Sequence, residues 1–173
     1  SGAGKSTLFK LILGELKPSA GKVEFQNSQG LPIKPNMSRI GYIPQDPNLF
    51  PGTIKENITM FNNQLDNQVA QVIDEVNFAA DIRKFKAGVD EKINLDDLNI
   101  SGGQRQKIVL ARSKIHGSDI ILIDEGTSAI DQTATMNILQ KLLKSKATIV
   151  FIAHNFNKQM QEMFDREIHL IKE

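Results

Sequence analysis

The sequence contains no cysteine, which excludes disulfide bonds and thiolate metal sites and suits a reducing, cytosolic setting. It has no apolar run near the roughly 18 to 20 residues that a membrane-spanning helix needs, and none of its segments has the pattern of a signal peptide. Neither sign of charge dominates, because the formal net charge is +1 at pH 7, so charge demands neither nucleic acid nor an anionic membrane as a partner. With 173 residues, 40% of them hydrophobic, the chain suits one globular domain with room for a small inserted subdomain.

The first seven residues, SGAGKST, match the second half of the phosphate-binding pattern GxxxxGK(S/T), the P-loop. In such a loop the backbone N–H groups wrap a β-phosphate, Lys5 reaches the β- and γ-oxygens, and the Ser6 hydroxyl binds Mg²⁺. A helix over residues 5–13 would place the anion on its N-terminus. The first glycine of the pattern, the strand before it and an initial methionine are lacking, so we expect the chain to be the interior of a longer one. The residues predicted to contact nucleotide here are Gly2, Ala3, Gly4, Lys5, Ser6 and Thr7.

The order of apolar and amphipathic segments predicts an α/β fold, in which a parallel sheet is flanked by helices. Apolar runs predict buried strands over residues 40–43, 120–123, 148–153 and 167–171, and a polar alternating segment predicts an edge strand over 22–26. Helices are expected over residues 5–13, 102–116, 131–143 and 157–164. The segment over residues 53–99 is polar, has helical periodicity and lacks a buried strand pattern. We therefore divide the chain into a first core part (1–52), a helical subdomain (53–101) and a second core part (102–173).

An acidic pair follows the most apolar predicted strand, in the sequence IILIDE at residues 120–125. A carboxylate at the carboxyl end of a buried parallel strand lies beside the P-loop, where Asp124 can hold Mg²⁺ directly or through water. Glu125 points elsewhere and is placed to polarise a water for attack on a γ-phosphate. The two motifs together predict phosphoryl-transfer chemistry.

The segment ISGGQRQK at residues 100–107 resembles the LSGGQ signature of ATP-binding cassette (ABC) ATPases. Physically it is a second phosphate site, formed by a serine hydroxyl and glycine N–H groups at a helix N-terminus. One γ-phosphate has no use for two such loops in one molecule. In the family, the signature of one subunit closes on ATP held by the P-loop of a second subunit. The resemblance thus implies nucleotide contacts from Ser101, Gly102, Gly103 and Gln104.

Other family motifs follow in order. The segment YIPQD at residues 42–46 resembles the Q-loop, whose glutamine, Gln45 here, touches Mg²⁺ or the attacking water. The segment SAID at residues 128–131 resembles the D-loop, which crosses the dimer interface, and its Asp131 is a further predicted nucleotide contact. His154 follows an apolar run and resembles the switch histidine, which hydrogen-bonds the γ-phosphate and orients the catalytic glutamate.

The segment LFPGTIKENI at residues 49–58 resembles the FxGTIxENI segment of exporter-type cassettes that are fused to a six-helix membrane domain. Three departures concern coupling rather than catalysis: Leu95 stands where a coupling glutamate is usual, Gly126 replaces proline or alanine, and Asn155 replaces arginine. The catalytic glutamine, glutamate and histidine are all present. We therefore expect the complete protein to hydrolyse ATP.

The resemblance implies an ATP-binding and ATP-hydrolysing domain of a membrane exporter, with ATP and Mg²⁺ as cofactors. The predicted catalytic residues are Glu125, His154, Gln45 and Lys5, and the predicted metal ligands are Ser6, Gln45 and Asp124. The expected partners are a second nucleotide-binding domain, identical or not, and a transmembrane domain, at the cytoplasmic face of the cell membrane, with no nucleic acid. Two alternatives stay open: a soluble ABC-type ATPase acting on DNA or ribosomes, and a non-hydrolysing regulatory module. Since strands before Ser1 are lacking, we expect the 173 residues alone to bind ATP weakly and to be inactive.

Overall fold

The computed structural model describes residues 4–96, 99–125, 130–152 and 157–170. At its centre lies a parallel sheet of three strands in the order β3 (Ile40–Ile43), β6 (Ile120–Asp124) and β7 (Thr148–Ile152). Ile40 pairs with Ile120, and Ile120 pairs with Thr148, so the strands run in register from one edge to the other. These are the apolar runs expected of strands that are covered on both faces.

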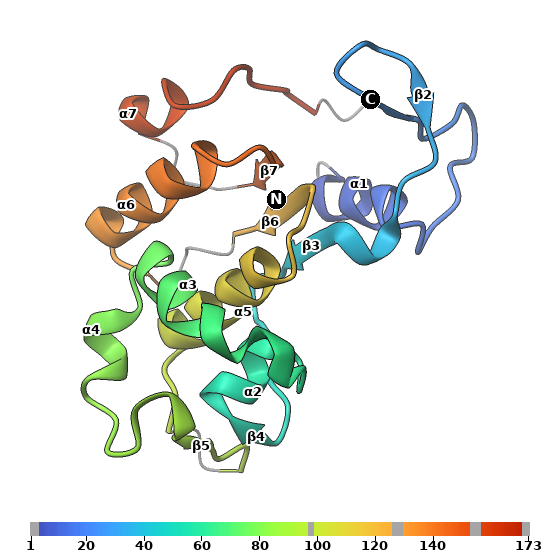
Figure 1. The fold of residues 1–173 in the computed structure, drawn as a ribbon. Helices are drawn as coiled ribbons and strands as arrows, with labels where there is room; N and C mark the ends of the chain where they lie inside the picture. The colour runs from blue at the N-terminus through green and yellow to red at the C-terminus, as the bar shows by residue number, and fades with distance from the viewer. Residues whose placement is uncertain (1–3, 97–98, 126–129, 153–156, 171–173) are drawn as a thin grey trace.

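Helices cover both faces of this sheet (Figure 1). On one face, Phe9 of α1 (Lys5–Ile12) packs against Leu122 and Ile152. On the other face, Ile121 and Ile123 pack against α5 (Gly102–Ile115) and α6 (Gln132–Leu143). Alternate residues of β6 thus point to opposite layers, as the twofold period of a strand requires. The α/β fold predicted from the sequence is confirmed.

The sheet and α5 approach each other closely at Gly41. A β-carbon added at Gly41 would lie only 2.7 Å from Ser113 Oγ of α5 and 2.9 Å from Ser118 Oγ. Glycine is therefore needed in β3 for α5 to pack at this distance.

The segment after β3 is helical, as its periodicity predicts, and lies at the lower end of the molecule in Figure 1. Its elements are α2 (Ile54–Thr59), η2 (Asn63–Gln68), α3 (Val69–Glu75), α4 (Ala79–Ile82) and η3 (Gly88–Asp90). One buried cluster joins this segment to β3, α5 and α6, so the boundaries at residues 52 and 101 stay a prediction.

The segment also contains strand pairing that its sequence pattern did not predict. A short antiparallel ladder joins β4 (Gly52–Thr53) to β5 (Lys92–Ile93). Each strand has only two residues, which is too short for an alternating pattern to be visible in the sequence.

Two other predicted elements are shorter than expected. The edge strand over 22–26 is reduced to β1 (Phe25–Gln26), which pairs with the unpredicted β2 (Pro32–Ile33) in a hairpin. Between this hairpin and the sheet lies η1 (Met37–Arg39). The helix expected over 157–164 is a single turn, α7 (Lys158–Gln161), capped by Asn157.

The strand predicted over 167–171 was wrong for the residues that the structure describes. Residues 166–170 form no strand, and the side chain of Ile168 is 67% exposed. An apolar run forms a buried strand only where a neighbouring strand pairs its backbone and a helix covers its side chains. The described part of the chain supplies neither here, and Ile171 lies outside it.

Among the helices of the described residues, none is both long and apolar enough to cross a lipid bilayer.

Candidate functional site

The start of α1 and the end of β6 meet at the carboxyl edge of the sheet. Gly4 precedes α1 in a left-handed conformation (φ 83°), which glycine adopts without strain. Ser6, in the first turn of α1, donates a hydrogen bond from Oγ to Asp124 Oδ2 at 3.0 Å. The two residues are 118 positions apart in the sequence, so the fold brings the predicted phosphate loop to the predicted metal-binding carboxylate.

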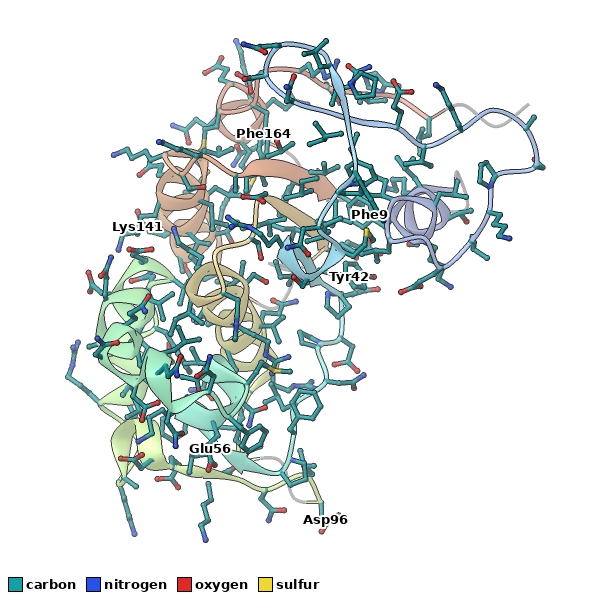
Figure 2. The ribbon with its side chains drawn as sticks, turned by 45° about the vertical axis from the view of Figure 1, so that its right-hand side comes forward. Phe9, Tyr42, Glu56, Asp96, Lys141 and Phe164 are labelled. Carbon is teal, nitrogen blue, oxygen red and sulfur yellow. The ribbon has the colours of Figure 1, made fainter. Side chains whose placement is uncertain are left out.

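The orientation of α1 is fixed by packing below this contact. Phe9 is 1% exposed, and its ring meets that of Tyr42 edge to face, with centroids 6.1 Å apart (Figure 2). Burial raises the pKa of the Tyr42 hydroxyl, and the negative charges of Asp124 and Glu15 raise it further. Tyr42 is therefore neutral at physiological pH beside the acidic edge of the sheet.

Glu125 leaves β6 in an unusual backbone conformation. Its φ is 52°, in the left-handed region that costs a residue with a side chain about 1–3 kcal/mol. Its N–H nevertheless donates to the Ile152 carbonyl of β7 at 2.9 Å. The carboxylate is turned towards the predicted Q-loop, where Gln45 Nε2 donates to Glu125 Oε2 at 3.0 Å.

Gln106 of α5 connects the same two residues from below. It is 1% exposed, and its Nε2 donates to the carbonyl oxygens of Gln45 (3.2 Å) and Glu125 (3.4 Å). Gln106 lies inside the signature motif, but no role was predicted for it from the sequence. The available signal for its role was that this polar residue lies on a helix next to an apolar run, since a buried amide needs hydrogen-bond partners.

The signature motif forms the N-terminus of α5. Ser101 caps the helix by accepting from Gln104 N at 3.2 Å, and Gln104 Oε1 accepts from Ser101 N at 2.9 Å. This reciprocal pair is a capping box, and it sets the first turn of the 14-residue helix. Ser101 itself is exposed, and the next three residues are half-buried, so the start of the helix can be reached from solvent.

A pocket of about 170 Å³ opens beside this N-terminus. Asp131 enters its wall from the start of α6, where its side chain caps the helix by accepting from Ala134 N at 2.9 Å. The pocket is lined by Asp81, Ser101, Gly103, Gln104, Lys107, Ile130 and Asp131. The predicted signature and the Asp131 end of the predicted D-loop thus border one hollow.

The exporter-like segment at residues 49–58 is held by Asn57, which is fully buried. Its Nδ2 donates to the carbonyl oxygens of Phe50 (2.9 Å) and Thr53 (3.0 Å), and its Oδ1 accepts from Phe50 N at 2.8 Å. Arg112 of α5 donates from Nε to the Asn57 carbonyl at 2.8 Å and stacks its guanidinium over the Phe50 ring. Burial lowers the pKa of Arg112, but a guanidinium stays charged at any physiological pH.

The structure thus arranges the predicted residues in two groups of contacts. Ser6, Gln45, Asp124 and Glu125 form the first, and Ser101, Gln104 and Asp131 belong to the second. Lys5 and Thr7 open α1 beside Ser6, and Gly102 and Gly103 open α5. Gly2, Ala3 and His154 lie outside the described residues, as do Gly126 and the first two residues of the predicted D-loop.

The donor atoms of the first group fit Mg²⁺. Hydroxyl, amide and carboxylate oxygens are hard ligands, and Mg²⁺ in nucleotide sites is usually held by one or two carboxylates together with phosphates and water. Within the described part of the chain, no three or more histidine, cysteine or acidic side chains are grouped so that they could hold a metal ion.

Comparison with known proteins agrees with these motifs. The family model described as "ABC transporter" matches residues 1–128. The lactococcin-A transport/processing ATP-binding protein of Lactococcus lactis subsp. lactis is 33% identical over 161 residues, which make up 91% of this chain and 22% of that protein. A putative export ATP-binding/permease protein of Rickettsia bellii is 33% identical over 162 residues, with 91% and 28% covered.

Among solved structures, a bacterial Atm1-family ABC exporter with ATP bound matches with a TM-score of 0.77 and 29% identity, over 90% of this chain and 28% of that one. The chain therefore spans only 22% to 28% of the length of these relatives. It corresponds to their ATP-binding domain. With the family model matching most of its length, the chain belongs to the ABC transporter family.

Proposed function

We propose that this domain binds ATP with Mg²⁺ and hydrolyses it to drive export across a membrane. The observation that carries the proposal is the convergence of four predicted site residues at the carboxyl ends of β3 and β6. Ser6 contacts Asp124 and Gln45 contacts Glu125, each at 3.0 Å, although the two residues of each pair are far apart in sequence.

Each residue has a role that follows from its chemistry. Lys5 neutralises the β- and γ-phosphates at the start of α1, where the helix N-terminus also favours negative charge. Ser6, Asp124 and Gln45 supply oxygen ligands for Mg²⁺, which when bound neutralises charge that develops on the transferred phosphoryl group. Glu125 accepts a proton from the attacking water, and Gln45 holds the Glu125 carboxylate in place. His154 supplies a further hydrogen bond to the γ-phosphate.

The exposed signature at Ser101 supports a dimer. Its solvent-facing N-terminus at residues 101–104 is suited to receive the γ-phosphate of ATP bound to a second nucleotide-binding domain. Head-to-tail pairing of two such domains would give each ATP one P-loop and one signature. The names of the Rickettsia and Atm1-family relatives favour an exporter over a soluble ATPase that acts on DNA or ribosomes. We infer a transmembrane partner domain and a location at the cytoplasmic face of the membrane.

The first test uses the two ends of β6 in the intact protein that carries this chain. Asp124→Asn removes the carboxylate at the carboxyl end of the strand and is expected to reduce Mg²⁺-dependent ATP hydrolysis at least ~100-fold, the usual scale for losing one group of such a site. The control is Asp119→Asn at the opposite end of the strand, where Asp119 makes an exposed ion pair with Arg39. Equal activity of the two variants would contradict the proposal.

A further inference from the structure

Asp81 of α4 touches the signature motif with both carboxylate oxygens. Its Oδ1 accepts a hydrogen bond from Gln104 Nε2 at 3.2 Å, and its Oδ2 accepts from Lys107 Nζ at 2.7 Å. The Asp81 and Lys107 side chains are only 17% and 12% exposed, so water screens this pair less than a surface pair. Gln104 thus has three contacts, since its Oε1 and its N–H already bind Ser101.

The position of Asp81 is fixed by the core beneath it. Phe78, three residues earlier, is fully buried, and Ala79, Ile82 and Phe85 pack against the same cluster. The α4 helix is therefore anchored in the core on this side, and Asp81 connects it to the first turn of α5. Asp81 also lines the pocket beside Ser101 and Asp131.

An ion pair of the same kind lies two helical turns further along α5. Lys114 Nζ lies 2.8 Å from Glu75 Oε2 of α3, and these side chains are 16% and 32% exposed. Glu75 also accepts from an amide, that of Gln71 at 2.9 Å. The Glu75 pair also joins a helix to α5 but touches no residue of the signature, so it provides a matched control.

We propose that Asp81 is a positioning residue of the signature: it holds the Gln104 side chain, and through it the Ser101 hydroxyl, in the orientation that closes on ATP of a second domain. The inference rests on the proposed function for its ATP-dependent part only. Its structural part, the ordering of the capping box by Asp81, stands apart from any activity.

The structural part is tested by amide hydrogen exchange without nucleotide, in the intact protein. Asp81→Ala should speed exchange at the Ser101 and Gln104 amides roughly tenfold, because a hydrogen bond to a charged group changes an equilibrium by about that factor or more. Exchange at the buried Ile108 should stay unchanged, which separates local loosening from global unfolding. Glu75→Ala should leave the Ser101 and Gln104 amides within about twofold of the parent protein. Equal effects of the two variants on these amides would overturn the proposal.

The ATP-dependent part is tested by dimerisation in a Glu125→Gln background, with sedimentation as the readout. Asp81→Ala should raise the ATP concentration for half-maximal dimer about tenfold, while ATP binding by the undimerised protein stays the same, because the P-loop is untouched. Asp81→Asn keeps an oxygen for Gln104 and should restore most of the dimer, whereas Glu75→Ala should have no effect. Weakened binding to the undimerised protein, or no rescue by asparagine, would overturn this role. If the parent protein itself forms no dimer with ATP, the proposed function fails, and hydrogen exchange alone then decides whether Asp81 orders the signature.

Discussion

Gln45 and Glu125 are 80 residues apart in the sequence, yet the amide of Gln45 donates to the carboxylate of Glu125 at 3.0 Å. Glu125 accepts this bond from a strained position, with φ at 52° immediately after β6. Strain of this kind persists only where surrounding contacts hold it, and it gathers at functional sites. The pair therefore links the end of β3, through the predicted Q-loop, to the residue that we assign as general base.

The general base can be tested by Glu125→Gln in the intact protein. The change keeps the shape of the side chain and an oxygen for the Gln45 amide, but it removes the group that accepts the proton. We expect ATP binding to persist and turnover to fall at least ~100-fold. Turnover within a few-fold of the parent protein would remove Glu125 from this role and favour a regulatory module.

The signature is tested by Ser101→Arg. Arginine removes the hydroxyl that caps α5, at a cost of about 0.5–2 kcal/mol, so the domain should stay folded with a slightly lower urea midpoint. A bulky cation at this helix N-terminus opposes the dipole and fills the place of the partner's phosphate, so the ATP-driven dimer should be lost. Sedimentation of a hydrolysis-deficient protein provides the measurement. An undiminished dimer fraction would count against head-to-tail pairing.

Much of the fold could be predicted from the sequence because its core elements carry strong local patterns. The runs at β3, β6 and β7 are nearly all apolar, and the serine and aspartate that precede α5 and α6 mark helix starts. The failures share a cause: the ladder of β4 and β5 and the predicted strand over 167–171 depend on partners far away in the chain. No local pattern records whether such a partner is present.

The site divides in the same way. Ser6, Asp124 and Glu125 stand in motifs whose residue types predict their chemistry, and Gln45 was predicted from the resemblance of its segment to the Q-loop. The fold brings the four residues together. Gln106 and Asp81 act through long-range contacts, with carbonyl oxygens 61 and 19 residues away in one case and with Gln104, 23 residues away, in the other. The role of a glutamine or an aspartate at these positions cannot be predicted until its three-dimensional neighbours are known.

Gln106 can be tested by Gln106→Met, which nearly preserves the volume but removes both donor bonds. The carbonyl groups of Gln45 and Glu125 then lose a partner, and we expect about 1–3 kcal/mol of destabilisation. Turnover should fall more than ATP affinity, because Glu125 loses support while the P-loop is untouched. The control is Gln140→Met at an exposed position of α6. Equal turnover in both variants would show that Gln106 serves packing alone.

The pH dependence of stability provides a test of Asp81. Burial alone would raise the pKa of this carboxyl, but the hydrogen bonds from Lys107 and Gln104 and the charges of Lys107 and Lys84 outweigh burial and lower the pKa. A carboxyl whose pKa is lower in the folded state contributes stability above its unfolded pKa of about 3.9, and this contribution is lost as the pH falls towards the folded pKa.

We therefore expect the free energy of unfolding to fall more steeply in the parent protein than in Asp81→Asn between pH 6 and pH 3. Urea denaturation at several pH values measures both slopes, and the difference between them isolates Asp81 from the other acids. A stability difference that does not change with pH would mean that the Asp81 charge makes no net contribution.

The final prediction concerns Asn57, which holds the exporter-like segment. Its side chain makes three hydrogen bonds with Phe50 and Thr53 backbone groups, and a further contact at 3.4 Å comes from Arg112. Asn57→Ala leaves the Phe50 N–H and two carbonyl groups without this partner, so we expect a loss of about 1.5–4.5 kcal/mol, at about 0.5–1.5 kcal/mol for each of the three bonds. Exposed Asn67 provides the control, since Asn67→Ala should change the urea midpoint little. Because the hydrogen bonds of Asn57 lie away from the contacts of Asp124 and Glu125, the folded fraction of Asn57→Ala should keep its affinity for ATP. An affinity that falls together with stability would instead show that the exporter-like segment and the nucleotide site are energetically coupled.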